Sequence, residues 1–144
     1  MDMLETIAEL SHEYGTAEYV KAGGGNTSCK DAETLWVKPS GTTLAGLKPE
    51  TFVMMDRAVL SHLYVVVTPV EPADREALVK NMMTSAVKTE TPGRPSVEAP
   101  LHDSLSARYV VHTHPPIVNG MTCAVGGRAA VARLFPDALW VPYI

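Results

Sequence analysis

The segment from Arg108 to Pro116, which reads RYVVHTHPP, constrains the fold of this chain more than any other. Its β-branched apolar residues favour a buried strand. Proline cannot donate to a strand ladder, so the Pro-Pro pair is expected to stop the strand directly after His114. Residues two apart on a strand point to the same face, with Cα atoms about 6.6 Å apart. The pattern therefore predicts that His112 and His114 converge on one metal ion.

The bulk composition sets limits on the class of protein. The 144 residues are 46% apolar and 19% charged, with a net charge of −4 and no basic stripe. This composition is typical of one globular domain and argues against a nucleic-acid or anionic membrane surface. No apolar run approaches the ~20 residues of a membrane-spanning helix. The segment Met1–Leu10 has three acidic residues and no basic ones, unlike a signal peptide, so a cytoplasmic location is expected.

Periodicity predicts interleaved helices and strands, and therefore an α/β or α+β class. Helices are expected over residues 2–14, 73–88, 96–107, 117–125 and 128–134. Strands are expected over residues 35–38, 52–55, 63–68, 108–114 and 139–144. Because the last predicted strand is apolar and has no polar tail, we expect a C-terminally truncated domain.

Two cysteines and two further histidines show no ligand spacing. Cys29 and Cys123 lie far apart in the sequence and are expected to be small buried residues. His12 and His62 belong to no pattern and are expected at the surface or with satisfied hydrogen bonds. The metal hypothesis therefore depends on other side chains.

A carboxylate and a third imidazole precede the histidine strand. Ser96 is expected to cap a helix on which Glu98 and His102, spaced i and i+4, share one face. Glu98 near a helix start suits the helix dipole, but near a metal it would act as a ligand or general base. His102 is interpreted as a structural neighbour of the site rather than as a ligand, although the spacing permits either.

Two turns of small residues, Gly23–Ser28 and Pro39–Thr42, can present backbone N–H groups and hydroxyls to an anion. Neither turn matches the phosphate-binding P-loop or the dinucleotide-binding glycine fingerprint. Each turn alone has a plain structural interpretation. Together with Ser96, just before Glu98, they suggest a phosphate site beside a metal site.

Taken in order, these motifs resemble the class II aldolase/adducin-head family, which includes the fuculose-phosphate and rhamnulose-phosphate aldolases. The resemblance covers nearly the whole chain, residues 1–144, as one domain. The matching segments are Ala22–Lys30, Trp36–Thr42, Arg94–Glu98 with His102, and Val110–His114. It implies a three-layer α/β/α fold around a largely antiparallel sheet, and a homo-oligomer, usually a tetramer. The residues from Phe135 resemble a branch sometimes fused to a dehydrogenase domain.

The resemblance also implies a site and a reaction. One zinc ion per chain would be bound by His112, His114 and Glu98, and Glu98 would also serve as the catalytic acid and base. Four residues would hold the phosphate of a phosphorylated sugar: Asn26, Ser40, Gly41 and Ser96. The implied activity is a zinc-dependent aldolase that cleaves a ketose 1-phosphate to dihydroxyacetone phosphate and an aldehyde such as lactaldehyde.

Three departures from the family pattern leave alternatives open. No histidine follows His114, although the family's third histidine ligand lies further along its chains. Ser96 is followed by Val97, so one hydroxyl before the glutamate is missing, and no tyrosine acid is placed. A sugar-phosphate epimerase or dehydratase, a non-catalytic adducin-like association module and an inactive truncated enzyme are the alternatives. Glutamate at position 98 favours an aldolase over the epimerases, whose pattern has aspartate there.

Overall fold

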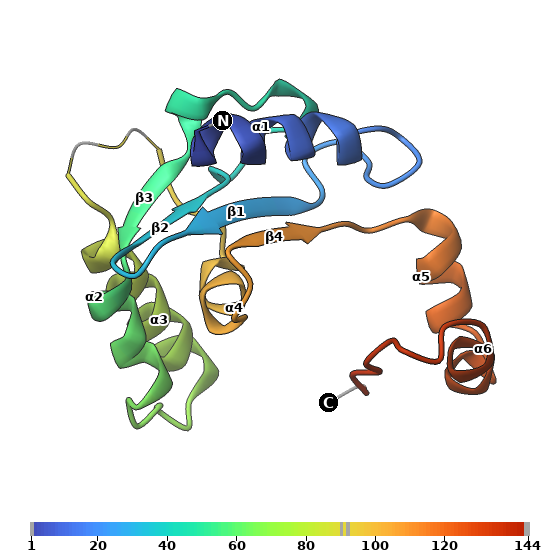
Figure 1. Ribbon diagram of the computed structural model, residues 1–144. Helices are drawn as coiled ribbons and strands as arrows, with labels where there is room; N and C mark the ends of the chain where they lie inside the picture. Colours follow the sequence, from blue (N-terminus) through green and yellow to red (C-terminus); the bar gives the residue numbers. More distant parts are fainter. Residues whose placement is uncertain (1, 90, 92, 143–144) are drawn as a thin grey trace.

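The computed structural model describes residues 2–142 except 90 and 92 (Figure 1). A four-stranded sheet lies at its centre, in the order β3-β2-β1-β4, and all neighbouring strands are antiparallel. The strands are β1 (Asn26–Lys30), β2 (Thr34–Val37), β3 (Val53–Asp56) and β4 (Tyr109–His112). The crossover from β3 to β4 contains three helices and places the predicted histidine strand beside β1.

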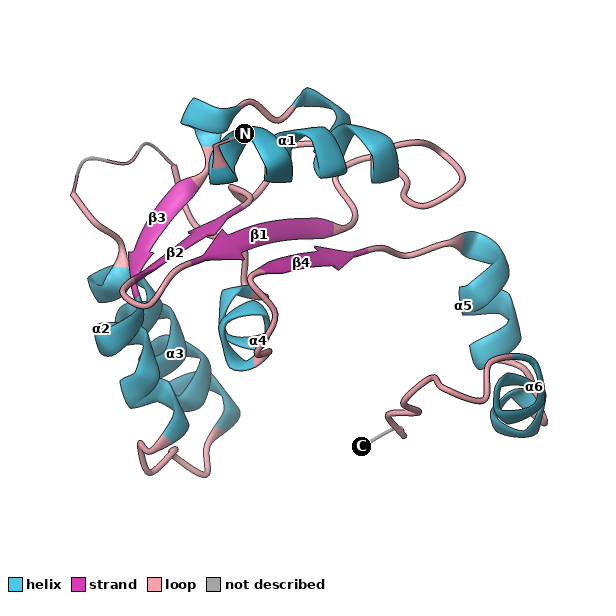
Figure 2. Ribbon diagram, in the orientation of Figure 1, coloured by secondary structure: helices cyan, strands magenta, loops and turns pink. Residues whose placement is uncertain are grey.

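Helices cover both faces of the sheet, as Figure 2 shows. The helix α1 (Met3–Tyr14) lies on one face, and α2 (Arg57–Ser61), α3 (Pro72–Ala86) and α4 (Ala99–Ser104) lie on the other. Beyond β4, α5 (Pro116–Thr122) and α6 (Gly127–Leu134) project from the end of the sheet. Short 3-10 helices span Leu44–Gly46, Pro49–Thr51 and His62–Tyr64. The predicted three-layer α/β/α fold with an antiparallel sheet is confirmed.

Each face of the sheet has its own hydrophobic core. Under α1, Ile7 and Phe52 pack with Cys29 of β1. On the opposite face, Leu35 and Val37 of β2 pack with residues of α2, α3 and the start of α4. Alternate strand residues point to opposite faces, so Leu35 and Val37 of β2 face one core and Trp36 between them packs against the other. The expected buried position of Cys29 is confirmed.

The start of β1 at Asn26 corrects the prediction of a small-residue turn over Gly23–Ser28. Asn26, Thr27 and Ser28 are polar, yet they are fully buried strand residues. Their side chains are hydrogen-bonded, for example Thr27 Oγ1 to Ser11 Oγ at 2.7 Å. Buried polar side chains with partners carry no apolar signature in the sequence, so this strand escaped detection.

The predicted strand over residues 63–68 is wrong. The carboxylate of Asp56 accepts the N–H of Val59 at 3.1 Å and starts α2, which runs into the 3-10 helix His62–Tyr64. The β-branched residues that suggested a strand are exposed: Val65 is 80% and Val67 is 92% accessible. A helix cap upstream therefore overrides local strand propensity here.

Other predicted boundaries also shift. The helix expected over residues 96–107 spans only Ala99–Ser104, and Glu98 rather than Ser96 holds the position before it. Residues 139–142 form no strand, and residues 143–144 lie outside the described part. Cys123 is exposed rather than buried, because α5 packs on α6 and not on the sheet. No described helix is long and apolar enough to cross a membrane.

Candidate metal centre

Two histidine rings meet at the end of β4. His112 is its last residue, and His114 lies in the loop that follows. The strand therefore ends at His112 and not, as predicted, at His114. The loop still brings the rings together: their Nε2 atoms are 3.0 Å apart and the ring centroids 4.7 Å apart. The N–H of His114 donates to the carbonyl of Tyr19 at 3.0 Å, which fixes the loop after the strand.

Glu98 approaches this pair from the residue before α4. Its Oε1 lies 3.4 Å from Nδ1 of His112, and its Oε2 accepts the side-chain amide of Asn26 at 3.1 Å. Its N–H donates to Oγ of Ser96 at 3.3 Å. The antiparallel pairing of Asn26 with His112 sets the amide beside the histidine, so β1, β4 and α4 together fix the carboxylate.

The three side chains fit a divalent metal ion. One ligand atom each from Glu98, His112 and His114 lies within 4.8 Å of the other two. Two nitrogen ligands at about 2.0–2.1 Å from a tetrahedral zinc ion stand about 3.3 Å apart. The 3.0 Å separation of the two Nε2 atoms is close to that value. Two imidazoles, one carboxylate and an open position are also a ligand set that catalytic zinc sites use.

His102 lies behind the centre rather than in it. The side chain is completely buried, with Nδ1 2.8 Å from Oγ of Ser28, and its carbonyl accepts Nζ of Lys30. Its ring centroid is 6.0 Å from that of His112. Burial, reinforced by the charge of His112, lowers the pKa of His102 to about 4, so this imidazole is neutral at physiological pH. This placement agrees with the structural interpretation of His102.

Sequence reasoning missed two polar residues that support the centre. Lys38 is 97% buried next to β2, and its Nζ donates to the carbonyl of Gly23 at 3.3 Å. Burial lowers the pKa of Lys38, while the nearby charge of Glu98 opposes that shift. Ser28 holds the ring of His102. The only sequence signal for Lys38 is a cation at the end of an apolar strand.

The predicted phosphate residues divide into two groups. The N–H of Ser40 donates to the carbonyl of Arg94 at 2.9 Å, and that of Ser96 donates to Lys38 at 3.3 Å, so the two loops lie side by side. Gly41 has a φ of +83°, and a Cβ added there would meet no heavy atom within 4 Å. Ser40, Gly41 and Ser96 therefore border an open turn, whereas Asn26 contacts Glu98 instead.

A cavity of about 410 Å³ opens beside the second histidine. His114, Lys21, Gly24, Pro116 and Asn119 line it. A Cβ on Gly24 would lie 2.9 Å from the carbonyl of Lys21, so only glycine lets this loop pass so closely. Of the three candidate ligands, only His114 lines this cavity.

An antiparallel sheet with helices on both faces carries, at its β4 edge, a histidine pair and a nearby carboxylate that could hold a divalent metal ion. The chain matches the model of the class II aldolase and adducin N-terminal domain over residues 5–139. It therefore belongs to the class II aldolase/adducin family.

The chain is also similar to individual proteins. It is 31% identical over 132 residues to the Bacillus subtilis (strain 168) protein named uncharacterized oxidoreductase YuxG, covering 85% of this chain and 18% of that protein. The N-terminal class II aldolase domain of a conserved protein from Thermoplasma acidophilum superposes with a TM-score of 0.82 and 21% identity, over 98% of this chain and 68% of that one. YgbL from Klebsiella pneumoniae gives a TM-score of 0.58 at 15% identity, over 86% and 49%. Both structural likenesses concern the fold.

Proposed function

We propose that this domain acts as a zinc-dependent aldolase that cleaves a ketose 1-phosphate to dihydroxyacetone phosphate and an aldehyde such as lactaldehyde. The observation that carries the proposal is the convergence of Glu98, His112 and His114 at one edge of a class II aldolase fold. Class II aldolases are metal-dependent, and the donor set of two imidazoles and one carboxylate suits zinc. A zinc ion bound there supplies Lewis-acid polarisation of a carbonyl oxygen.

Glu98 is proposed as the catalytic acid and base. Its side chain is 29% exposed, so substrate can reach it, while Asn26 holds one oxygen by a hydrogen bond. The other oxygen faces His112 and stays available for proton transfer. A carboxylate held in this way moves a proton to or from a substrate carbon without first reorganising its own surroundings.

Ser40, Gly41 and Ser96 are proposed to bind the substrate phosphate. The turn at Gly41 leaves open space beside its backbone, and backbone hydrogen bonds of Ser40 and Ser96 hold the two serine-bearing loops side by side. Such small-residue turns bind anions through N–H and O–H donors. Asn26, proposed with these three from the resemblance, contacts the catalytic carboxylate and would link the phosphate site to the metal centre.

The extent of the domain and its oligomeric state are part of the proposal. The chain spans 18% of the length of YuxG and 68% and 49% of two solved structures. We propose that residues 1–144 form one aldolase-type domain and that it works as a homo-oligomer, a tetramer by family analogy. Gel filtration with light scattering measures that state directly.

The test is a cleavage assay with fuculose 1-phosphate and rhamnulose 1-phosphate in the presence of zinc. Release of dihydroxyacetone phosphate is followed by a coupled reductase, and products are also separated by chromatography. Cleavage that falls at least about 100-fold in Glu98→Gln supports the proposal, because general acid–base catalysis contributes about that much. The exposed Glu33→Gln is the matched control. Epimerised ketose phosphate without cleavage would instead favour an epimerase.

A further inference from the structure

A second cavity, of about 520 Å³, lies between α3 and the loop over residues 94–97. Three cations line it: Arg75 and Lys80 from α3, and Arg94 from the loop. Ser40, which belongs to the proposed phosphate turn, also lines it. No role follows for these cations from the family motifs discussed above.

The cavity and the phosphate turn share their walls. The N–H of Ser40 donates to the carbonyl of Arg94, and Pro39 forms an isolated bridge with Pro95. Pro95 and Val97, both on the cavity wall, flank Ser96 in sequence. Ser40 therefore belongs both to the proposed phosphate turn and to the wall of the cavity that carries the three cations.

The charges on the cavity wall favour a ligand with about two negative charges. The turn itself offers neutral donors, the hydroxyls of Ser40 and Ser96 and the backbone at Gly41. Three cations and the single carboxylate of Glu76 give the cavity lining a net charge of +2. A phosphate monoester carries about −1.5 to −2 at neutral pH. Arginine is also the side chain best suited to bidentate phosphate binding.

We propose that Arg94, assisted by Arg75 and Lys80, binds the phosphate group of the substrate from the α3 side and so makes this domain selective for phosphorylated sugars. The inference rests on the proposed function, because it takes the turn at Ser40 as the phosphate site. Val97 offers no hydroxyl to the phosphate, so a contact from Arg94 would replace the missing hydrogen bond. Selectivity then comes from charge as well as from hydroxyl hydrogen bonds.

The experiment measures binding of inorganic phosphate to the metal-free protein by titration calorimetry at two salt concentrations. Arg94→Ala and the double variant Arg75→Ala/Lys80→Ala are compared with Arg128→Ala, a cation on the exposed side of α6. We expect each of the first two to weaken binding about tenfold, as loss of one charge-assisted contact does, and to reduce the salt dependence. Circular dichroism checks the fold, and the α3 variants change only exposed positions.

Separate zinc titration keeps the two hypotheses apart. Phosphate affinity equal in all variants, or no phosphate binding in the parent protein, overturns the inference while zinc binding leaves the proposed function standing. Phosphate binding that depends on Arg94, in a protein that binds no zinc, supports the cavity as a phosphate site and contradicts the aldolase function. Binding lost equally in Arg128→Ala would show nonspecific attraction and would also overturn the inference.

Discussion

The side-chain amide of Asn26 donates to Oε2 of Glu98 over 3.1 Å, joining a buried strand residue to the carboxylate of the candidate metal centre. The two residues are 72 positions apart in sequence. The β1–β4 ladder pairs Asn26 with His112, so one amide sits beside both the carboxylate and a histidine. This arrangement makes Asn26 a positioning residue for Glu98.

Asn26→Ala should therefore weaken metal binding. Outer-shell partners of metal ligands typically contribute about 10- to 100-fold in affinity, and Glu98 would lose its partner. Competition with a chromogenic zinc chelator measures the change. Asn81→Ala, at an exposed position of α3, is the control and should leave the affinity within about twofold. Equal affinities in the parent and Asn26→Ala would show that the amide does not position the carboxylate.

The buried imidazole of His102 predicts a pH-dependent stability of the metal-free protein. Its pKa is about 4 in the folded state against 6.5 for a free histidine, mainly because of burial. As pH falls below 6.5 the unfolded chain takes up a proton that the folded state refuses, so stability falls until about pH 4. Above pH 6.5 the contribution is constant. The loss is on the order of 3 kcal/mol.

Urea unfolding across that pH range measures the effect. The difference between the parent protein and His102→Gln isolates this group from the carboxylates that titrate nearby. His62→Gln, at an exposed position, should retain the parent's pH dependence. An unchanged pH dependence in His102→Gln would contradict a neutral, buried imidazole.

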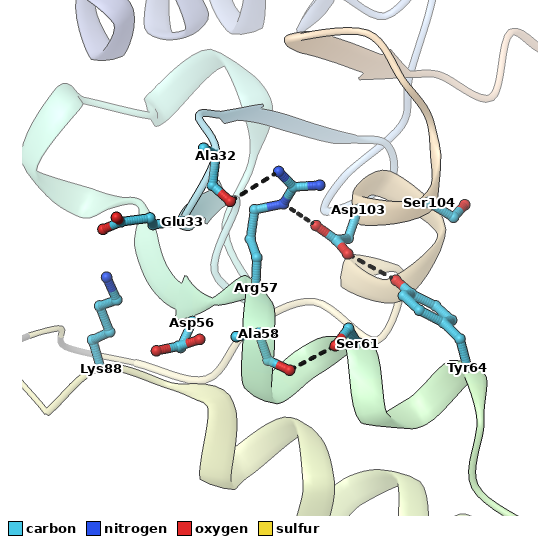
Figure 3. A pocket seen from close by; sticks show the side chains of 10 residues that line it. All are labelled: Ala32, Glu33, Asp56, Arg57, Ala58, Ser61, Tyr64, Lys88, Asp103 and Ser104. Carbon is cyan, nitrogen blue, oxygen red and sulfur yellow. Dashed lines mark hydrogen bonds and ion pairs between the residues drawn. The ribbon is translucent and has the colours of Figure 1, made fainter.

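The helix that carries His102 is held by an ion pair remote from the metal centre (Figure 3). Nε of Arg57 lies 2.5 Å from Oδ1 of Asp103, and the hydroxyl of Tyr64 donates to Oδ2 at 3.1 Å. Asp103→Ala leaves both donors without this partner. We expect a loss of about 2–3 kcal/mol, less than for a wholly buried pair because Arg57 is partly exposed.

Thermal and urea unfolding measure this loss. Arg57, Tyr64 and Asp103 line a cavity of about 750 Å³, and Glu33 lines it too. Because Glu33 is exposed, Glu33→Ala should change stability by less than about 0.5 kcal/mol. Equal stabilities of the parent and Asp103→Ala would show that the ion pair does not contribute to the free energy of unfolding.

The two cysteines should differ sharply in reactivity. Cys29 is fully buried, and burial raises the pKa of its thiol to about 12, whereas Cys123 is exposed. The thiolate is the reactive form, so alkylation of the native protein at pH 8 should label only Cys123. Peptide mass spectrometry identifies the site, and unfolding in urea should release the second thiol. Labelling of Cys29 in the native state would contradict its packing under α1.

Much of the site was predictable because its residues obey local rules. A β-branched run closed by His112, His114 and a proline pair predicts where two imidazoles meet. The spacing from Glu98 to His102 predicts a shared side of one helical turn, and the N–H of His102 does donate to the carbonyl of Glu98 at 3.1 Å. These patterns depend on neighbours in sequence, which a single chain reveals.

The missed features depend on contacts between distant segments. Strand β1 buries Asn26 and Ser28 because Glu98 and His102 supply hydrogen bonds from more than 70 residues away. Lys38 is buried because the carbonyl of Gly23 receives its ammonium group. Residues 65–67 look like a strand by propensity but pair with no strand, since the cap at Asp56 commits the chain to a helix. Tertiary partners decide such cases.

The central claim is a metal centre built from Glu98, His112 and His114, and metal content measures it most directly. Protein purified without added metal is analysed by elemental mass spectrometry beside His112→Ala, His114→Ala and, as a control, His12→Ala. The account predicts about one zinc per chain in the parent and control, and loss of the metal in the first two variants. A metal content equal in all four proteins, or none in the parent after zinc is supplied, would contradict it.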